Sequence, residues 1–264
     1  MKRRTPKLGQ HFLKNPLYAK RLAEAVRVRR GEALLEIGPG EGVLTRELLA
    51  TGAHVIAVEK DATLVKKLQE TFAQEIESGQ FTLIEDDVRN FNPRSLKLEA
   101  RSYAMAANIP YYITGEILRM FLSAEEKPRT MALLVQKEVA ERIIAADGKE
   151  SILSLSVKAY GGPKIIAKVS RGNFSPPPSV DSAILVVENI SRDLFIGIDE
   201  ALFFKIVRAG FSSKRKLLLK NLANVFPLPV VRTAFKECEL DEKTRAEDVP
   251  LEKWRSLAKR LSSG

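Results

Sequence analysis

The stretch "EALLEIGPGEGVLTRELLATG", residues 32–52, decides the fold. Its apolar run at 33–37 leads into a turn with glycines at 38, 40 and 42, and an amphipathic segment follows as far as Gly52. This order predicts a buried strand, a glycine-rich turn and a helix. Glycine accepts positive φ and lets a ligand approach the backbone closely, so the turn is a candidate nucleotide site. Its G-x-G-x-G spacing differs from the G-x-G-x-x-G of most dinucleotide sites.

Strand and helix patterns alternate along the first part of the chain. Further strands are predicted at 53–60, 81–87, 102–112 and 129–136, and helices at 16–30, 61–78, 114–124 and 137–146. Such alternation is typical of an α/β fold, in which helices cover both faces of a parallel sheet. We therefore predict a Rossmann-like architecture.

The pattern changes after about residue 150. A helix is predicted at 151–161, strands at 163–170 and 182–190, and short amphipathic helices at 199–211, 214–226 and 251–264. The two strands are joined by a proline-rich loop, so we expect them to be antiparallel at the far edge of the sheet. No strand pattern recurs beyond the last of them. We predict a catalytic domain over 1–190 and a small helical domain over 191–264.

The charge balance points to a polyanionic partner. The 264 residues include 43 Lys and Arg against 33 Asp and Glu, a net charge of +10. Such an excess most often serves nucleic-acid binding. One cysteine excludes an internal disulfide, and the two distant histidines, His11 and His54, predict no metal site.

The sequence predicts a cytoplasmic protein without a membrane partner. No apolar run is long enough to span a bilayer, and the basic N-terminus lacks the hydrophobic core of a secretory signal. Pro6 and Pro16 interrupt any amphipathic helix there, which argues against a mitochondrial presequence. A basic arm that contacts phosphates fits this segment better.

Four polar side chains stand at or near the ends of successive predicted strands: Glu36, Glu59, Asp86 and Asn108. Ligands of open α/β sheets bind outside the carboxyl ends of the strands, so these groups should meet in one crevice. A single acid of this kind is most often a helix cap or a solvated turn residue. Four of them, each about one strand–helix unit apart, are better explained by a shared ligand.

The chemistry of these groups suits S-adenosylmethionine. Glu59 is placed to accept hydrogen bonds from two ribose hydroxyls, Asp86 from an adenine amino group, and Glu36 from a cationic amine. No Lys or Arg follows the glycines at the spacing of a triphosphate-binding loop. A ligand with adenosine at one end and an amino acid at the other therefore fits best.

The run "AANIPYYITGEI", residues 106–117, is a poor helix and a poor central strand because of its proline. In a methyltransferase it suits an adenine N6 acceptor, whose lone pair is delocalised into the ring. The side-chain oxygen of Asn108 and a main-chain carbonyl at Ile109 or Pro110 would draw the N–H bonds out of plane. Tyr111 would offer a face for stacking. Taken alone, the run is equally well explained as an ordinary strand-to-helix turn.

Several motifs, in this order and spacing, resemble the ribosomal RNA adenine N6-dimethyltransferases over nearly the whole chain. They are "LGQHFL" (8–13), "EIGPGEGVLT" (36–45), "AVEKD" (57–61), "NIPYYIT" (108–114), "NFSPPPSVDS" (173–182) and "GFSSKRKLLLKNL" (210–222). The resemblance is closest to the small-subunit branch of that family. It implies a class I S-adenosylmethionine-dependent methyltransferase with a small helical C-terminal domain.

The resemblance also implies roles for individual residues. It places the catalytic motif at Asn108, Pro110 and Tyr111, with Phe174 closing over the other face of the target base. It places cofactor contacts at Gln10, His11, Phe12, Leu13, Glu36, Gly38, Gly40, Glu59, Lys60, Asp86, Asp87 and Asn108. The basic C-terminal segment implies RNA contacts from Lys214, Arg215 and Lys216. His11 stands where the family often has Asn, and the family pattern favours Asp86 over Asp87 for the cofactor adenine.

The implied reaction is dimethylation of two adjacent adenosines in the hairpin loop near the 3′ end of small-subunit ribosomal RNA, during ribosome biogenesis. The expected partner is that RNA within a pre-ribosomal particle, and the expected state is a monomer. Two alternatives stay open: a large-subunit adenine dimethylase of the macrolide-resistance type, and a non-catalytic assembly or transcription factor that binds RNA or DNA. We also expect Phe174→Ala to fold normally, although the residue is alternatively explained as part of the core.

Overall fold

The structure is a computed structural model that describes residues 11–29, 31–91 and 102–262. Contacts between residues divide the chain into two units: 1–140 with 162–190, and 141–161 with 191–264. The predicted domains differ from these units in the segment 141–161. This segment groups with the second unit because Tyr160 packs against Phe195 and donates a hydrogen bond of 2.6 Å to Glu200.

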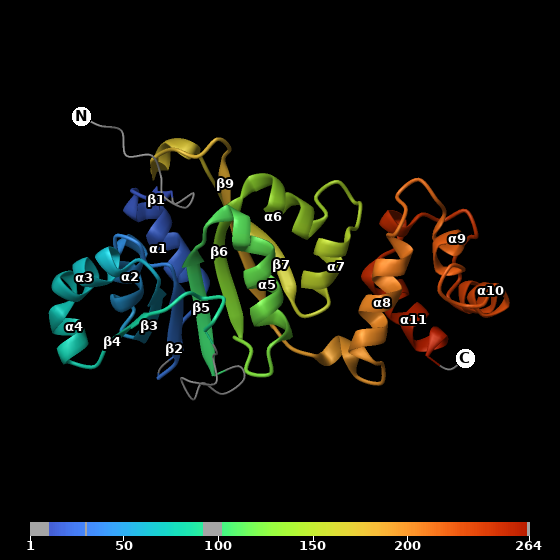
Figure 1. Cartoon of the computed structure of the whole chain (residues 1–264), viewed down its shortest axis with the longest axis horizontal. Coiled ribbons are helices and arrows are strands. Elements are labelled where there is room, and N and C mark those ends of the chain that lie inside the picture. Colours follow the sequence, from blue (N-terminus) through green and yellow to red (C-terminus); the bar gives the residue numbers. More distant parts are fainter. Residues whose placement is uncertain (1–10, 30, 92–101, 263–264) are drawn as a thin grey trace. The chain divides into compact units, whose positions relative to one another are not determined.

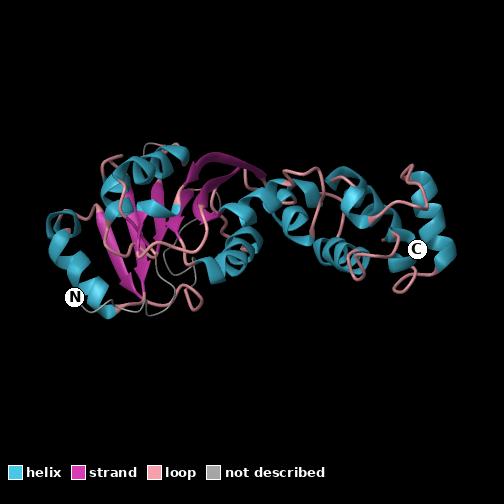
Figure 2. Ribbon diagram, turned by 90° about the horizontal axis from the view of Figure 1, so that it is seen from above, coloured by secondary structure: helices cyan, strands magenta, loops and turns pink. Residues whose placement is uncertain are grey.

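A seven-stranded sheet forms the centre of the first unit (Figure 1). In spatial order its strands are β4 (Phe81–Glu85), β3 (His54–Glu59), β2 (Ala33–Ile37), β5 (Tyr103–Asn108), β6 (Thr130–Gln136), β9 (Ser182–Glu188) and β7 (Gly162–Val169). The strands from β4 to β6 are parallel, and helices cover both faces of the sheet (Figure 2). The predicted α/β class is confirmed.

The strand order reverses between β2 and β5. From β2 the chain moves outward to β3 and β4, and it then returns to place β5 on the other side of β2. The carboxyl edge of the sheet therefore has a topological switch point, where open α/β sheets bind their ligands.

The last two strands are antiparallel, as predicted. β9 pairs with both β6 and β7, which leaves β7 as the edge strand with Pro163 in it. Proline is tolerated at an edge because its missing N–H leaves no central pairing unmade. The sequence did not predict the small sheet formed by β1 (Phe12–Leu13) and β8 (Phe174–Ser175).

The helices of the first unit are α1 (Pro16–Ala25), α2 (Val43–Leu49), α3 (Ala62–Thr71), α4 (Ala73–Glu77), α5 (Thr114–Ser123) and α6 (Lys137–Ile144). Helix α6 extends across the division at residue 140. Two short 3-10 turns are η3 (Tyr111–Ile113) and η4 (Arg171–Asn173). Asn15 and Asp61 cap α1 and α3, each accepting from a backbone N–H two residues ahead. Such caps satisfy amides that have no partner within the helix.

Two helices are shorter than predicted. The helix expected at 16–30 ends at Ala25, because Arg27 takes a positive φ of 47°. The helix expected at 61–78 breaks at Phe72, which is buried. A Cβ on Gly42 would lie 2.6 Å from the Phe72 ring, so the ring packs directly on the glycine turn. Both changes follow from tertiary contacts that local periodicity does not contain.

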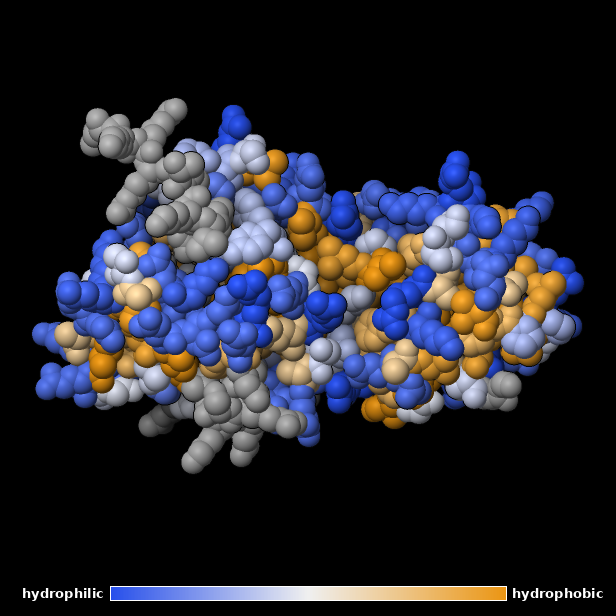
Figure 3. Space-filling view, viewed as in Figure 1, coloured by the Kyte–Doolittle hydropathy of each residue, from blue (hydrophilic) through white to orange (hydrophobic). Residues whose placement is uncertain are grey.

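The core of the first unit lies between sheet and helices. Leu34, Val55 and Ala104 from the strands pack with Leu22 and Leu48 from α1 and α2, and all are fully buried. Hydrophilic side chains cover much of the molecular face seen in Figure 3. The burial pattern explains why the central strands read as continuous apolar runs.

The second unit is helical. Its helices are α7 (Ile152–Lys158), α8 (Glu200–Gly210), α9 (Leu218–Leu222), α10 (Leu228–Glu237) and α11 (Leu251–Leu261), with short 3-10 turns η5 (Asp193–Phe195) and η6 (Ala246–Asp248). α10 was not predicted, and the helix expected at 214–226 is reduced to α9. Among the described helices, none combines the length and apolar character needed to cross a membrane.

Candidate active site

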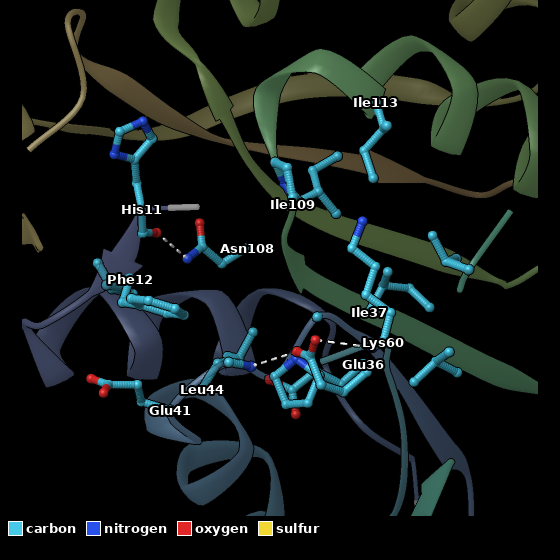
Figure 4. A pocket seen from close by; sticks show the side chains of 18 of the residues that line it. His11, Phe12, Glu36, Ile37, Glu41, Leu44, Lys60, Asn108, Ile109 and Ile113 are labelled. Atoms are coloured by element: carbon cyan, nitrogen blue, oxygen red, sulfur yellow. Dashed lines mark hydrogen bonds between the residues drawn. The ribbon is translucent and has the colours of Figure 1, made fainter. Parts of the chain in front are cut away.

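A cavity opens at the switch point, beside the carboxyl ends of β2, β3, β4 and β5. Its volume is about 970 Å³, counting the space that opens to solvent. The predicted site residues that line it are His11, Phe12, Leu13, Glu36, Gly38, Gly40, Glu59, Lys60, Asp86, Asp87, Asn108, Pro110 and Tyr111. The fold thus brings together residues from five separate stretches of sequence, and several of their side chains are seen together in Figure 4.

The glycine turn forms one wall of the cavity. Gly38 and Gly40 take φ values of 67° and 59°, which disfavour residues with a side chain. A Cβ on Gly38 would meet nothing within 4 Å, whereas one on Gly40 would lie 2.9 Å from the Phe12 ring. Gly38 therefore leaves space beside the backbone for a ligand, and Gly40 lets the N-terminal segment close over the turn.

Glu59 is buried and joins the turn to the end of β3. Its carboxylate accepts hydrogen bonds from the backbone N–H groups of Gly40, Lys60 and Asp61, at 3.2, 2.9 and 3.0 Å. A carboxylate has about four acceptor positions, so these bonds orient the group and still leave capacity for a ribose hydroxyl.

We expect Glu59→Ala to weaken S-adenosylmethionine binding by more than tenfold, since each charge-assisted hydrogen bond is worth about 1.5–3 kcal/mol. Titration calorimetry measures this affinity. Glu85→Ala is the matched control, because Glu85 is the exposed register partner of Glu59 on β4. Equal affinities of wild-type and Glu59→Ala protein would exclude Glu59 from the cofactor site.

Glu36 lies beneath the glycine turn and is 1% exposed. One carboxyl oxygen accepts a 2.7 Å hydrogen bond from Thr45, and the other has no partner within the described residues. Burial raises the pKa of Glu36 to about 8; the Thr45 bond opposes this rise and nearby Glu59 adds to it. The carboxyl group is therefore mostly protonated at neutral pH, and a cationic amine bound beside it would favour its ionised form.

This raised pKa predicts how stability depends on pH. Between about pH 4.5 and 8 the folded protein retains the Glu36 proton while the unfolded chain releases it. Glu36 should therefore lower the free energy of unfolding as pH rises, by at most about 1.4 kcal/mol per pH unit. Urea unfolding of the ligand-free protein at several pH values should show a flatter profile for Glu36→Gln. Identical slopes for both proteins would contradict the prediction.

Asp86 and Asp87 both line the cavity after β4. Asp86 accepts a 2.7 Å hydrogen bond from the N–H of Asp87. Asp87 is held by the Arg89 side chain at 3.0 and 2.5 Å, and this hydrogen bonding lowers the pKa of Asp87 to about 2. The preference for Asp86 at the cofactor adenine stays a prediction.

Asn108 ends β5, and a distant backbone group fixes its amide. Its Nδ2 donates a 3.1 Å hydrogen bond to the carbonyl of His11 (Figure 4). This leaves the side-chain oxygen available as an acceptor. The Pro110 carbonyl accepts from the N–H of Ile113 at 3.1 Å and closes the η3 turn, so the Ile109 carbonyl is the better second acceptor.

Tyr111 is half-buried and is held from two sides. Its hydroxyl shares a 2.6 Å hydrogen bond with Ser182, and its ring lies 5.8 Å from the His11 ring between centroids. The His11 Nδ1 in turn donates to the carbonyl of Pro176 at 2.8 Å. Ser182 was not predicted; the only signal for it was its place at the end of the motif "NFSPPPSVDS".

Phe174 lies in the core in this structure, as its alternative explanation expected. It is fully buried on β8, opposite Leu13, and packs in the main core of the first unit. It is not among the residues that line the cavity, so this structure forms no aromatic sandwich with Tyr111. The stacking role stays a prediction that requires the side chain to leave the core.

The remaining predicted residues lie elsewhere. Gln10 falls outside the described residues. Lys214, Arg215 and Lys216 occupy an exposed turn of the second unit and not a helix face, because α9 begins only at Leu218. The cavity is also lined by Arg89 and Tyr112, which sequence reasoning missed. Within the described residues, no cluster of His, Cys, Asp or Glu is suited to hold a metal ion.

Comparison with known proteins decides the family. The model of the family "Ribosomal RNA adenine dimethylase" matches residues 1–263. The chain belongs to this family. It is accordingly an enzyme of the S-adenosylmethionine-dependent methyltransferases that dimethylate adenine in ribosomal RNA, and the predicted cofactor and enzyme class are confirmed.

Relatives of this adenine dimethylase carry the name Ribosomal RNA small subunit methyltransferase A. One from Dehalococcoides mccartyi is 39% identical over 95% of this chain and 86% of its own length. One from Clostridium botulinum is 34% identical over 95% of this chain and 91% of its own length.

Two solved structures match the whole fold. The 23S rRNA methyltransferase ErmE has a TM-score of 0.78 and 27% identity, covering 95% of this chain and 99% of its own. A dimethyladenosine transferase from Plasmodium falciparum has a TM-score of 0.78 and 24% identity, covering 94% of this chain and 96% of its own, and it supports the fold alone.

Proposed function

We propose that this adenine dimethylase transfers two methyl groups to the N6 of each of two adjacent adenosines, in the hairpin loop near the 3′ end of small-subunit ribosomal RNA. We further propose that it acts as a cytoplasmic monomer on a pre-ribosomal particle. The names of relatives at 33–39% identity support the small subunit over the large one.

The observation that carries the proposal is the orientation of Asn108. Because its Nδ2 donates to His11, its oxygen is available to accept from the target amine. The residues at the glycine turn fit the cofactor: Gly38 leaves open space, Glu59 offers a fixed carboxylate, and Glu36 has an unpartnered buried oxygen. When bound there, S-adenosylmethionine supplies an activated methyl group.

The chain's own residues prepare the acceptor. The Asn108 oxygen and the Ile109 carbonyl accept hydrogen bonds from the two N–H groups of adenine N6. These hydrogen bonds draw the N–H groups out of the ring plane and expose the nitrogen lone pair. Tyr111, locked by Ser182, presents a ring face for the base, and such stacking is worth about 1–3 kcal/mol. A neighbouring strong base is not needed, because the methyl donor is itself activated.

Methylation mapping tests this function. The enzyme is incubated with labelled cofactor and either small subunits lacking these methyl groups or large subunits, and the RNA is digested and analysed by mass spectrometry. We expect dimethyladenosine at two adjacent positions of small-subunit RNA. Label only in large-subunit RNA would favour the macrolide-resistance type of enzyme, and no label in either would favour a non-catalytic RNA-binding protein.

A further inference from the structure

The basic triplet of the second unit stands on an exposed turn. Lys214, Arg215 and Lys216 follow the end of α8 and precede α9, and all three side chains are exposed. In the described part of the second unit, ion pairs to carboxylates involve other cations, such as Lys149, Arg232 and Arg260. The triplet therefore presents three positive charges to solvent.

Asn221 on α9 holds this turn through hydrogen bonds from its side chain. Its side chain is buried, at 1% exposure, and its Nδ2 donates to the carbonyls of Gly210 and Ser213 at 2.6 and 3.0 Å. The Ser213 carbonyl also accepts the N–H of Lys216 at 3.1 Å. One buried amide thus fixes the residue at the end of α8 and the residue directly before the triplet.

Close packing holds the first end of the same turn. Gly210 ends α8, and a Cβ there would overlap the ring of Trp254 and lie 2.7 Å from Leu218. Trp254 is fully buried and stacks on Phe211, with ring centroids 5.6 Å apart. The backbone that leads into the triplet therefore has little room to move.

We propose that Asn221 is a positioning residue, which holds Lys214, Arg215 and Lys216 in the arrangement that binds RNA phosphates. Long cationic side chains lose conformational entropy when they bind. If the backbone of the turn is already fixed before binding, its ordering does not add a further entropy cost. This inference rests on the proposed function only in taking ribosomal RNA as the partner. The alternative is that Asn221 contributes to the stability of the second unit alone.

A double-mutant cycle separates the two roles. Asn221→Ala is made in the wild-type chain and in a Lys214→Gln/Arg215→Gln/Lys216→Gln background, and binding to unmethylated small subunits is measured for each. We expect Asn221→Ala to raise the Kd about three- to tenfold in the wild-type chain and less than about twofold in the triple background. The triple variant should also lower the slope of log K against log salt by about two to three.

Asn224→Ala is the matched control, since Asn224 lies shortly after α9 with an exposed side chain. It should leave the Kd unchanged. Thermal melts check folding, and if Asn221→Ala melts early, the cycle is repeated with Asn221→Leu, which keeps the branched shape of the side chain while removing both hydrogen bonds.

Equal effects of the Asn221 substitution in both backgrounds, or no effect in either, would overturn the inference. A triple variant that binds as tightly as the wild type would also overturn it, because the RNA contacts would then lie elsewhere. None of these outcomes changes the methylation map of the wild-type enzyme, on which the proposed function depends.

Discussion

Asn108→Ala should retain cofactor binding and lose methyl transfer, with kcat lowered by about 10²–10³-fold. The substitution removes the amide oxygen that we propose accepts from the substrate amine; the hydrogen bond to the His11 carbonyl orients this amide. Loss of one preorganised hydrogen-bonding group at a reacting centre typically has this effect. Calorimetry with S-adenosylmethionine and single-turnover methylation of small subunits measure the two quantities separately.

Asn108→Asp refines this test. The carboxylate keeps an acceptor but has no N–H to donate to the His11 carbonyl, so its orientation is no longer fixed. We expect a rate between those of the wild type and Asn108→Ala. Wild-type rates in both variants would mean that the main-chain carbonyl at Ile109 suffices as acceptor.

Phe174→Ala should destabilise the protein by about 3–5 kcal/mol, the usual cost of removing a buried phenylalanine ring. Phe174 is fully buried, lies opposite Leu13 in the small sheet, and belongs to the same core cluster as Val169. This result would differ from the sequence-based expectation that the variant folds normally. Urea unfolding of the two proteins measures the difference.

Phe174→Leu separates packing from stacking. Leucine retains much of the buried volume and should fold, but it has no aromatic face. If Phe174 leaves the core to stack on the target base, the leucine variant should accumulate unmodified or monomethylated adenosine. Full dimethyladenosine from a folded leucine variant would assign Phe174 to the core alone.

Much of the site was visible in the sequence because it follows strand ends. Glu59 and Asn108 end strands whose apolar runs are evident, and Glu36 stands one residue before the end of its strand. Parallel strands bring their carboxyl ends to one edge. The glycine turn was recognisable for a similar reason, since positive φ at Gly38 and Gly40 restricts which residues fit there. The cofactor roles predicted for them rest on residue chemistry and family resemblance.

The sequence by itself determined the α/β class, the antiparallel final strands and the set of polar groups at the sheet edge, because these depend on local periodicity and on residue type. Only the tertiary structure decided the burial of Phe174, the raised pKa of Glu36 and the direction of the Asn108 amide. Asn108 and His11 are 97 positions apart. No local pattern encodes such a contact, because it arises only when the folded sheet brings the N-terminal strand over the end of β5.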